Sequence, residues 1–172
     1  TPDNTVVVID GTTNQITQSY DLGTIYNKVF RSLYFDSFNH SIFITMVEVL
    51  EDKTIQTKLL KFSTGGIYIT EKQYSYLIND MEFVSPSKFY MSTSNGIYKV
   101  NPNDLNFSTQ LTPGYFLEIV FARNENKMFG VNKSTNSIIS INTNNDQISS
   151  TINNYPLNII DGVYNPINKK VY

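Results

Sequence analysis

Three carboxylates recur at one place in a repeated pattern, three residues before an aromatic residue. They are Asp80, Glu118 and Asp161, which precede Phe83, Phe121 and Tyr164, and Ser32 holds the same position before Phe35. Carboxylates that converge on one axis can bind a cation, a water cluster or an amine. Arg31, beside the first of these positions, adds a positive charge. We therefore select these three carboxylates and Arg31 as candidate ligand-binding residues. The structural alternative is that the carboxylates accept backbone hydrogen bonds or are solvated at strand ends.

The sequence offers little catalytic or metal-binding chemistry elsewhere. His40 is the only histidine, and one histidine cannot supply a multi-histidine metal site. The chain has no cysteine, and no nucleophile can be paired with His40. Residues 142–146 alternate oxygen-bearing side chains as calcium loops do, but the central Gly and the later Glu are missing. We therefore predict no catalytic residue, no metal and no cofactor, and hence a protein that is not an enzyme.

Four tyrosines are candidates for contact with a partner. They are Tyr74, Tyr76, Tyr115 and Tyr155, and each lies at the end of an apolar run or in a loop. A tyrosine combines rigid apolar area with a hydroxyl group that can form hydrogen bonds. The other aromatic residues mostly alternate within apolar runs, which is typical of core positions. The expected partner is a protein or a carbohydrate.

The composition indicates which elements position these residues. Only one of the 172 residues is alanine, whereas there are 12 Tyr and 11 Phe, a bias typical of strands and unfavourable to helices. Charged residues make up 16% of the chain, too few for long disordered tracts. The net charge of −2 gives no basic face for nucleic acid. No apolar run approaches the roughly 20 residues of a membrane span.

The strands are arranged in a repeat. Aromatic anchors at Phe35, Phe83, Phe121 and Tyr164 are separated by 48, 38 and 43 residues, close to the roughly 40–50 residues of a four-stranded propeller blade. We expect these anchors to be equivalent and buried. The pattern predicts an all-β chain of 16 strands, without a helix longer than one turn. It divides into a half-blade at 5–22, blades at 31–75, 78–112 and 116–153, and a half-blade at 157–172.

Two parts of the chain carry a family resemblance. Residues 8–16, Val-Ile-Asp-Gly-Thr-Thr-Asn-Gln-Ile, and residues 128–152, which include Gly-Val-Asn and Ile-Ile-Ser-Ile-Asn, resemble the YVTN-type β-propeller repeat. The resemblance implies a surface or secreted binding module, although related propellers include quinoprotein dehydrogenases. In a propeller, the first strand of each blade faces a central channel, so Asp80, Glu118 and Asp161 are expected at one channel mouth.

Two questions about the whole molecule stay open at this point. The two half-blades either pair into a closed ring of four blades or belong to an open arc cut from a larger ring, and we favour the arc.

The main functional hypothesis is a binding or scaffold module, extracellular or on the cell surface, with a cytoplasmic location left open. The alternatives are a fragment of a lactonase-like or quinoprotein-like enzyme, and a structural subunit of a large assembly. The chain is also expected to be part of a longer protein or assembly.

Overall fold

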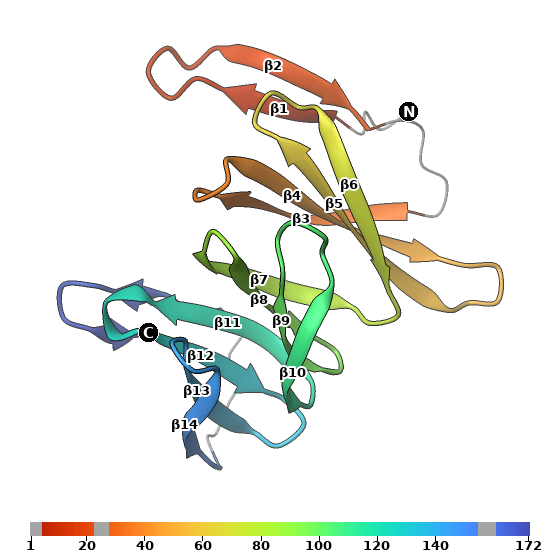
Figure 1. Ribbon diagram of the computed structural model, residues 1–172. Helices are drawn as coiled ribbons and strands as arrows, with labels where there is room; N and C mark the ends of the chain where they lie inside the picture. Colours follow the sequence, from red (N-terminus) through yellow and green to blue (C-terminus); the bar gives the residue numbers. More distant parts are fainter. Residues whose placement is uncertain (1–4, 23–27, 155–160) are drawn as a thin grey trace.

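Short strands separated by polar turns make up nearly all of the described chain. The computed structural model describes residues 5–22, 28–154 and 161–172, which form sixteen strands (Figure 1). The first pair is β1 (Thr5–Ile9) and β2 (Ile16–Asp21). The first four-stranded sheet contains β3 (Lys28–Asp36), β4 (Ser41–Val49), β5 (Ile55–Ser63) and β6 (Tyr68–Tyr74). The second contains β7 (Ile78–Ser85), β8 (Lys88–Thr93), β9 (Gly96–Val100) and β10 (Phe107–Pro113). The third contains β11 (Phe116–Ala122), β12 (Lys127–Asn132), β13 (Ser137–Asn142) and β14 (Gln147–Ile152). The last pair is β15 (Tyr164–Asn165) and β16 (Lys170–Val171).

Each sheet is an antiparallel meander in which consecutive strands pair. The predicted all-β architecture of four-stranded antiparallel blades is therefore confirmed, and we call the three complete sheets blades 1, 2 and 3. The one helical element among the described residues is a 3-10 turn at Arg123–Glu125. No helix in the described ranges is long and apolar enough to cross a membrane.

The turns explain why asparagine and aspartate are so frequent between the strands. In the turn after β1, the Asp10 carboxylate accepts hydrogen bonds from the backbone N–H groups of Thr12 and Thr13, at 2.7 and 2.9 Å. Asn14 at the end of this turn has φ of 56° and Asn136 has φ of 48°, a region that asparagine tolerates better than most residues. These local preferences fix where each strand ends.

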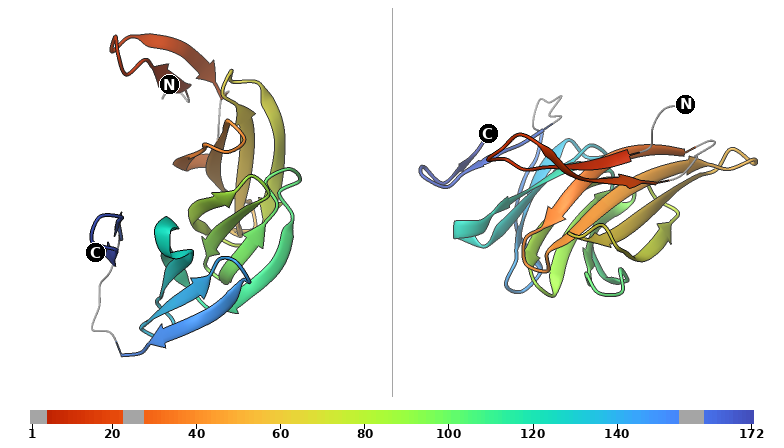
Figure 2. Two further views of the ribbon diagram at one scale, coloured as in Figure 1. Left: turned by 60° about the vertical axis from the view of Figure 1, so that its left-hand side comes forward. Right: turned by 90° about the horizontal axis from the view of Figure 1, so that it is seen from above.

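The sheets follow one another around an arc. The first strands β3, β7 and β11 lie on its concave side, and the fourth strands β6, β10 and β14 lie on its convex side (Figure 2). β1 pairs with β2 and β15 pairs with β16, and each pair forms a separate two-stranded sheet. No ladder joins the two pairs among the described residues, so these residues form the expected partial ring.

The core lies between neighbouring blades, because blade 2 packs an apolar cluster against blade 1 on one face and against blade 3 on the other. Side chains alternate along a strand, so Phe89 and Met91 of β8 pack in the cluster shared with blade 1, whereas Tyr90 packs in the cluster shared with blade 3. Phe43 of blade 1 meets Phe83 of blade 2 with ring centroids 5.0 Å apart. This alternation determines which side chains of β8 face blade 1 and which face blade 3.

The four anchoring aromatics lie on the first strands β3, β7, β11 and β15, as expected. Their burial differs from the prediction. Phe83 is buried and Phe121 and Tyr164 are half-buried, but Phe35 is 54% exposed. Phe83 is covered by Phe43 of the preceding blade, whereas Phe35 is preceded by the β1–β2 hairpin alone. The expectation that Phe35 would be buried is therefore wrong.

Candidate functional site

The inner strand β7 carries a row of carboxylates that contacts the inner strand β11 of the next blade. The Asp80 carboxylate accepts hydrogen bonds from the backbone N–H groups of Met81, at 2.7 Å, and Ile119, at 3.1 Å. Glu82, two residues along on the same face of β7, accepts one from the N–H of Phe121 at 3.2 Å. These side chains satisfy backbone groups of β11 that face no further strand. This is the structural alternative that the sequence left open.

Asp80 and Glu118 lie within hydrogen-bonding reach of each other at this seam. Burial is the main cause that raises the pKa of both groups, to about 6 for Asp80 and about 8 for Glu118. The negative charges of Asp80 and Asp161 raise the pKa of Glu118 further. Both carboxyl groups of this pair therefore hold their protons to a higher pH than an exposed carboxyl group does. The hydroxyl group of Tyr34 on β3 lies beside this contact: it donates to the Asn79 carbonyl at 3.4 Å, and it also lowers the pKa of Asp80.

The structure brings Asp80 and Glu118 together at this seam. Asp161 is exposed, and its charge acts on Glu118. Within the described ranges, no group of three acidic or histidine side chains is arranged to hold a metal ion. A role in binding any other ligand stays a prediction.

Two residues of this row were missed by the sequence analysis. Burial raises the pKa of Glu82 to about 7, and the Arg123 guanidinium has a smaller, opposite effect. The cation near the row is thus Arg123, in the 3-10 turn after β11. The strand period of two would have identified Glu82, because it lies two residues after Asp80. No sequence pattern identified Arg123, because it lies outside the strands.

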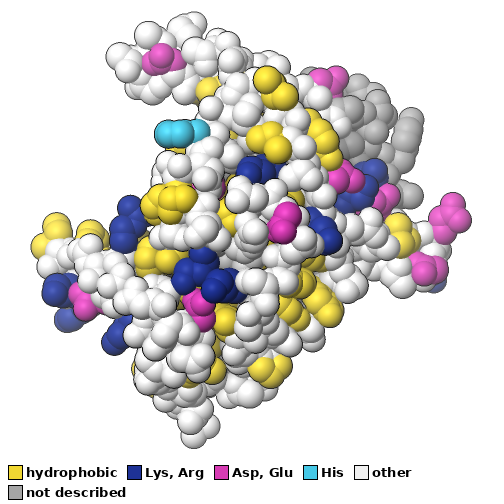
Figure 3. Space-filling view, in the orientation of Figure 1, with side chains coloured by type: hydrophobic (Ala, Val, Ile, Leu, Met, Phe, Trp, Pro, Cys, Tyr) yellow, Lys and Arg dark blue, Asp and Glu magenta, His cyan; other side chains and the backbone are white. Residues whose placement is uncertain are grey.

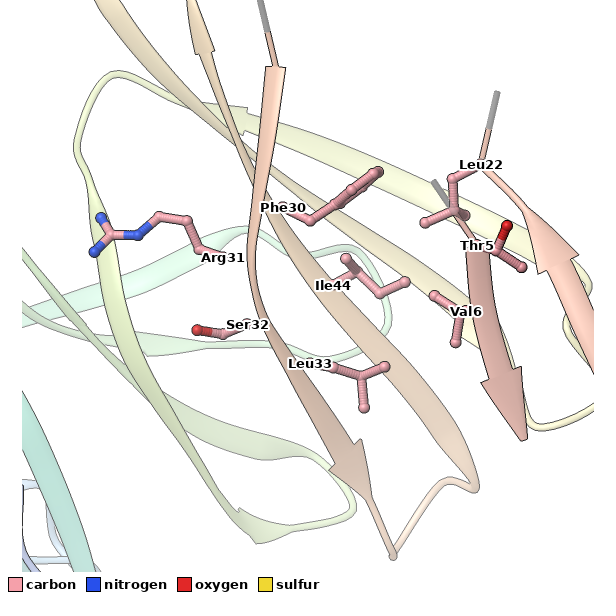
Figure 4. A pocket seen from close by; sticks show the side chains of 8 residues that line it. All are labelled: Thr5, Val6, Leu22, Phe30, Arg31, Ser32, Leu33 and Ile44. Carbon is pink, nitrogen blue, oxygen red and sulfur yellow. The ribbon is translucent and has the colours of Figure 1, made fainter. Parts of the chain in front are cut away.

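Arg31 lines a cavity between the β1–β2 hairpin and blade 1. This cavity has a volume of about 280 Å³, and its lining is mostly apolar. Figure 4 shows Phe30 and Ile44 of blade 1 facing Val6 and Leu22, while the Arg31 side chain extends away from them. Arg31 therefore borders this cavity, and its grouping with the carboxylates stays a prediction.

A second cavity, of about 480 Å³, lies where the outer strand of blade 1 meets blade 2. We call it the aromatic pocket. Its lining residues are Lys72, Gln73, Tyr74, Ser75, Tyr76, Tyr98, Asn106 and Phe107. They come from the end of β6, the connection to β7, β9 and the start of β10. Its volume is in the range of roughly 300–1,000 Å³ that is usual for ligand pockets.

Four aromatic rings form a stacked row along the aromatic pocket. Tyr76 stacks on Tyr98 with ring centroids 6.0 Å apart and planes at 11°, and Tyr98 stacks on Phe107 at 4.1 Å and 17°. Tyr74 follows at 4.7 Å from Phe107, and its hydroxyl group donates a hydrogen bond to the Leu105 carbonyl at 2.5 Å. The row is therefore held by both ring packing and a backbone hydrogen bond.

The four predicted contact tyrosines differ in where they lie. Tyr76 is half-buried and lines the aromatic pocket. Tyr74 also lines it, but it is only 5% exposed, so it supports the other rings instead of presenting a surface. Tyr115, 38% exposed, lies between β10 and β11 outside the pocket. Tyr155 lies outside the described residues. Tyr98 and Phe107 were missed because their alternation within strands is typical of the core.

The surface charges are mixed on the face that carries most of the outer strands. Figure 3 shows Lys and Arg side chains interspersed with Asp and Glu, with separate apolar groups between them. At one seam, Asp146 binds Lys88 and Lys99 of the neighbouring blade, at 2.9 and 2.6 Å. Part of the positive charge is therefore neutralised by interblade ion pairs.

Comparison with known proteins identifies the fold. No protein-family profile matches the sequence, and no curated protein matches it. Among solved structures, it is similar to the Dos1 propeller, with a TM-score of 0.64 and 12% identity over 96% of this chain and 46% of that one. It is also similar to a putative dipeptidyl aminopeptidase IV from Bacteroides ovatus, with a TM-score of 0.68 and 16% identity over 95% of this chain.

The chain spans 46% of the first of these proteins and 28% of the second, so it corresponds to less than half of either. At such low identity the likeness concerns the fold alone, and membership of the YVTN-type family stays a prediction. The four-stranded antiparallel blades, their order around the arc and both structural neighbours lead to one conclusion: this chain has the fold of a partial β-propeller.

Proposed function

We propose that this chain is a binding module that engages a protein or glycan partner through the aromatic pocket. The observation that supports the proposal is the row of stacked rings, Tyr76, Tyr98, Phe107 and Tyr74, beside a cavity of ligand size. Aromatic side chains give large contact area at a small cost in conformational entropy. The pocket is built on strands of two packed blades, so little ordering is required when a partner binds.

The carboxylate row is a weaker candidate for the binding site. Asp80 and Glu82 already accept backbone hydrogen bonds from β11, and Glu118 shares a hydrogen bond with Asp80. Groups that are committed to one another in this way have few lone pairs left for a ligand. We therefore assign the row to the joining of blades 2 and 3.

The test of this proposal is an array of purified secreted proteins, cell-surface proteins and glycans, probed with the 172-residue chain. The Tyr76→Ala variant is probed in parallel, and Tyr115→Ala is the matched control because Tyr115 is an exposed tyrosine outside the pocket. We expect at least one ligand that is retained by Tyr115→Ala and lost by Tyr76→Ala. If every bound ligand is retained by Tyr76→Ala, the pocket is not the contact surface.

A second candidate function is the propeller part of a larger enzyme. It is favoured by the similarity to a protein named as a putative dipeptidyl aminopeptidase. A protein extended beyond this chain at both ends would then hydrolyse dipeptidyl p-nitroanilides, whereas a binding module would not. The structural subunit of a large assembly and the extracellular or surface location remain predictions from the repeat and its resemblance.

A further inference from the structure

We propose that the aromatic pocket binds a neutral sugar ring of a glycan. This inference rests on the proposed binding function and names the ligand class of the same pocket. The first argument is the accessible ring surface. Tyr98 and Phe107 each have a neighbouring ring of the row on both sides, and Tyr74 and Tyr98 are buried, at 5% and 6% exposure. Tyr76 is half-buried and ends the row, so no other ring of the row covers its outer face. The face of an aromatic ring is apolar and carries partial negative charge, so it attracts the polarised C–H groups on the flat side of a pyranose.

The polar rim of the pocket supplies the second argument. Gln73 and Asn106 carry amide groups, which offer both donors and acceptors, and Ser75 carries a hydroxyl group. The hydroxyl groups of a sugar are likewise both donors and acceptors, so such a rim can bind several of them. Gln73, Ser75 and Asn106 are exposed. The Gln73 side-chain amide also donates to Gln56, and Asn106 Oδ1 accepts from Lys72, so the amide oxygen of Gln73, the amide N–H groups of Asn106 and the Ser75 hydroxyl group are left for a ligand.

The charge of the pocket selects a neutral ligand. Lys72 is the one charged residue in the lining, and its ammonium group donates a hydrogen bond to Asn106 Oδ1 at 2.9 Å. The pKa of the nearby Asp104 carboxyl is lowered mainly by the backbone N–H group of Asn106, which donates to it at 3.0 Å, and to a smaller extent by the Lys72 charge. A negative counter-charge therefore lies near Lys72. The site therefore has no excess positive charge that would favour an anionic sugar.

The pocket is also held in shape before any ligand binds. The Tyr74 hydroxyl group donates to the Leu105 carbonyl at 2.5 Å, and the Asn95 side-chain amide donates to the Tyr98 hydroxyl group at 2.8 Å. Both tyrosines belong to the core cluster shared by blades 1 and 2. A pre-formed site loses little entropy on binding, which matters for a ligand as small and polar as a sugar.

The test is titration of the isotope-labelled chain with cellohexaose, chitohexaose and mannohexaose, each up to about 10 mM. We expect at least one to shift the NMR signals of the Gln73 and Asn106 side-chain amides. Tyr76→Ala should weaken this binding about tenfold, and Tyr76→Phe should retain it. Gln73→Ala, an exposed change that leaves the core intact, should also weaken it, and Tyr115→Ala should leave it unchanged.

Three outcomes would overturn the inference. They are the absence of shifts with all three oligosaccharides, shifts that persist unchanged in both Tyr76→Ala and Gln73→Ala, and binding of hexagalacturonate or decaproline in place of the neutral sugars. These outcomes are distinct from failure of the proposed function. A protein partner that depends on Tyr76, together with no response to the sugars, would reject the glycan and keep the binding module.

Discussion

Asp80 and Glu82 take the place that a neighbouring strand would have along the inner edge of β11. That edge has no further strand to pair with, so its N–H groups need acceptors. The two carboxylates provide them at Ile119 and Phe121. Asp80, three residues before the anchor Phe83, therefore joins blade 2 to blade 3. A carboxylate suits this position because the partly buried edge of β11 needs hydrogen-bond acceptors.

Stability should decrease as the pH rises through the range in which this carboxylate row ionises. Burial raises the pKa values of Asp80, Glu82 and Glu118 to about 6, 7 and 8. The folded chain therefore binds these protons more tightly than the unfolded chain does, so the stabilisation is complete below about pH 4 and is lost through pH 6–8. We expect urea denaturation to give a free energy of unfolding lower by about 2 kcal/mol or more at pH 9 than at pH 5.

The control for this experiment is Glu118→Gln, which keeps the shape of the side chain but removes its titration. Its stability should depend less on pH over the same range. Equal or greater stability of the unmodified chain at pH 9 would contradict the assignment of protons to this row.

At the scale of the elements, the blades are joined by polar contacts as well as by apolar packing. The turn between β13 and β14 reaches across to blade 2, where Asp146 binds Lys88 of β8 and Lys99 of β9. The Tyr90 hydroxyl group also donates to Asp146. Because three groups of blade 2 bind this one carboxylate, the turn holds blade 3 against blade 2.

Replacement of Asp146 should weaken the contact between blades 2 and 3. In Asp146→Ala, the hydroxyl group of Tyr90 and the ammonium group of Lys99 lose this acceptor. The ammonium group of Lys88, whose side chain is only 14% exposed, keeps only the Thr143 carbonyl. We expect the free energy of unfolding to fall by about 3 kcal/mol, measured by urea denaturation at pH 7. Glu51→Ala, at an exposed position in the β4–β5 hairpin, should change it by less than about 0.5 kcal/mol. Equal effects of the two changes would show that the Asp146 contact contributes nothing specific.

At the scale of the whole molecule, the arc has well-packed blades in its middle and two-stranded hairpins at its ends. Blade 2 shares an apolar cluster with each neighbour. In the hairpins, by contrast, Ile9 of β1 is 58% exposed and Tyr172, after β16, is 63% exposed. Isolated two-stranded hairpins are marginally stable in water, so order should decrease from the middle of the arc towards both ends.

Hydrogen exchange followed by mass spectrometry measures this gradient. We expect the amides of β8 and β9 to be protected most, and those of β1, β2, β15 and β16 to exchange at least about tenfold faster, because their opening costs less free energy. If β1 and β16 were protected as strongly as β8, the two end pairs would be joined in a closed ring in solution. That result would contradict the arc.

The strand positions and the repeat could be predicted from the sequence, because both depend on local patterns. Alternating apolar residues define a strand, and Asn, Asp and Gly define a turn, so an all-β chain of four-stranded antiparallel sheets could be expected. The burial of Phe35 could not be predicted, since it depends on what covers β3 from the preceding blade. Its local pattern is the same as that of Phe83, but only Phe83 is covered by Phe43.

For the candidate sites, too, some features could be predicted from the sequence and others depend on how the blades pack. The sequence by itself determined that acidic residues recur on the inner strands and that Tyr74 and Tyr76 lie at the end of a strand. Only the tertiary structure decided that Asp80 and Glu118 contact each other, and that Tyr76 stacks on Tyr98 and Phe107. The physical reason is distance along the chain. Local backbone preferences extend over a few residues, whereas these contacts join residues from different strands and are fixed by how one blade packs on the next.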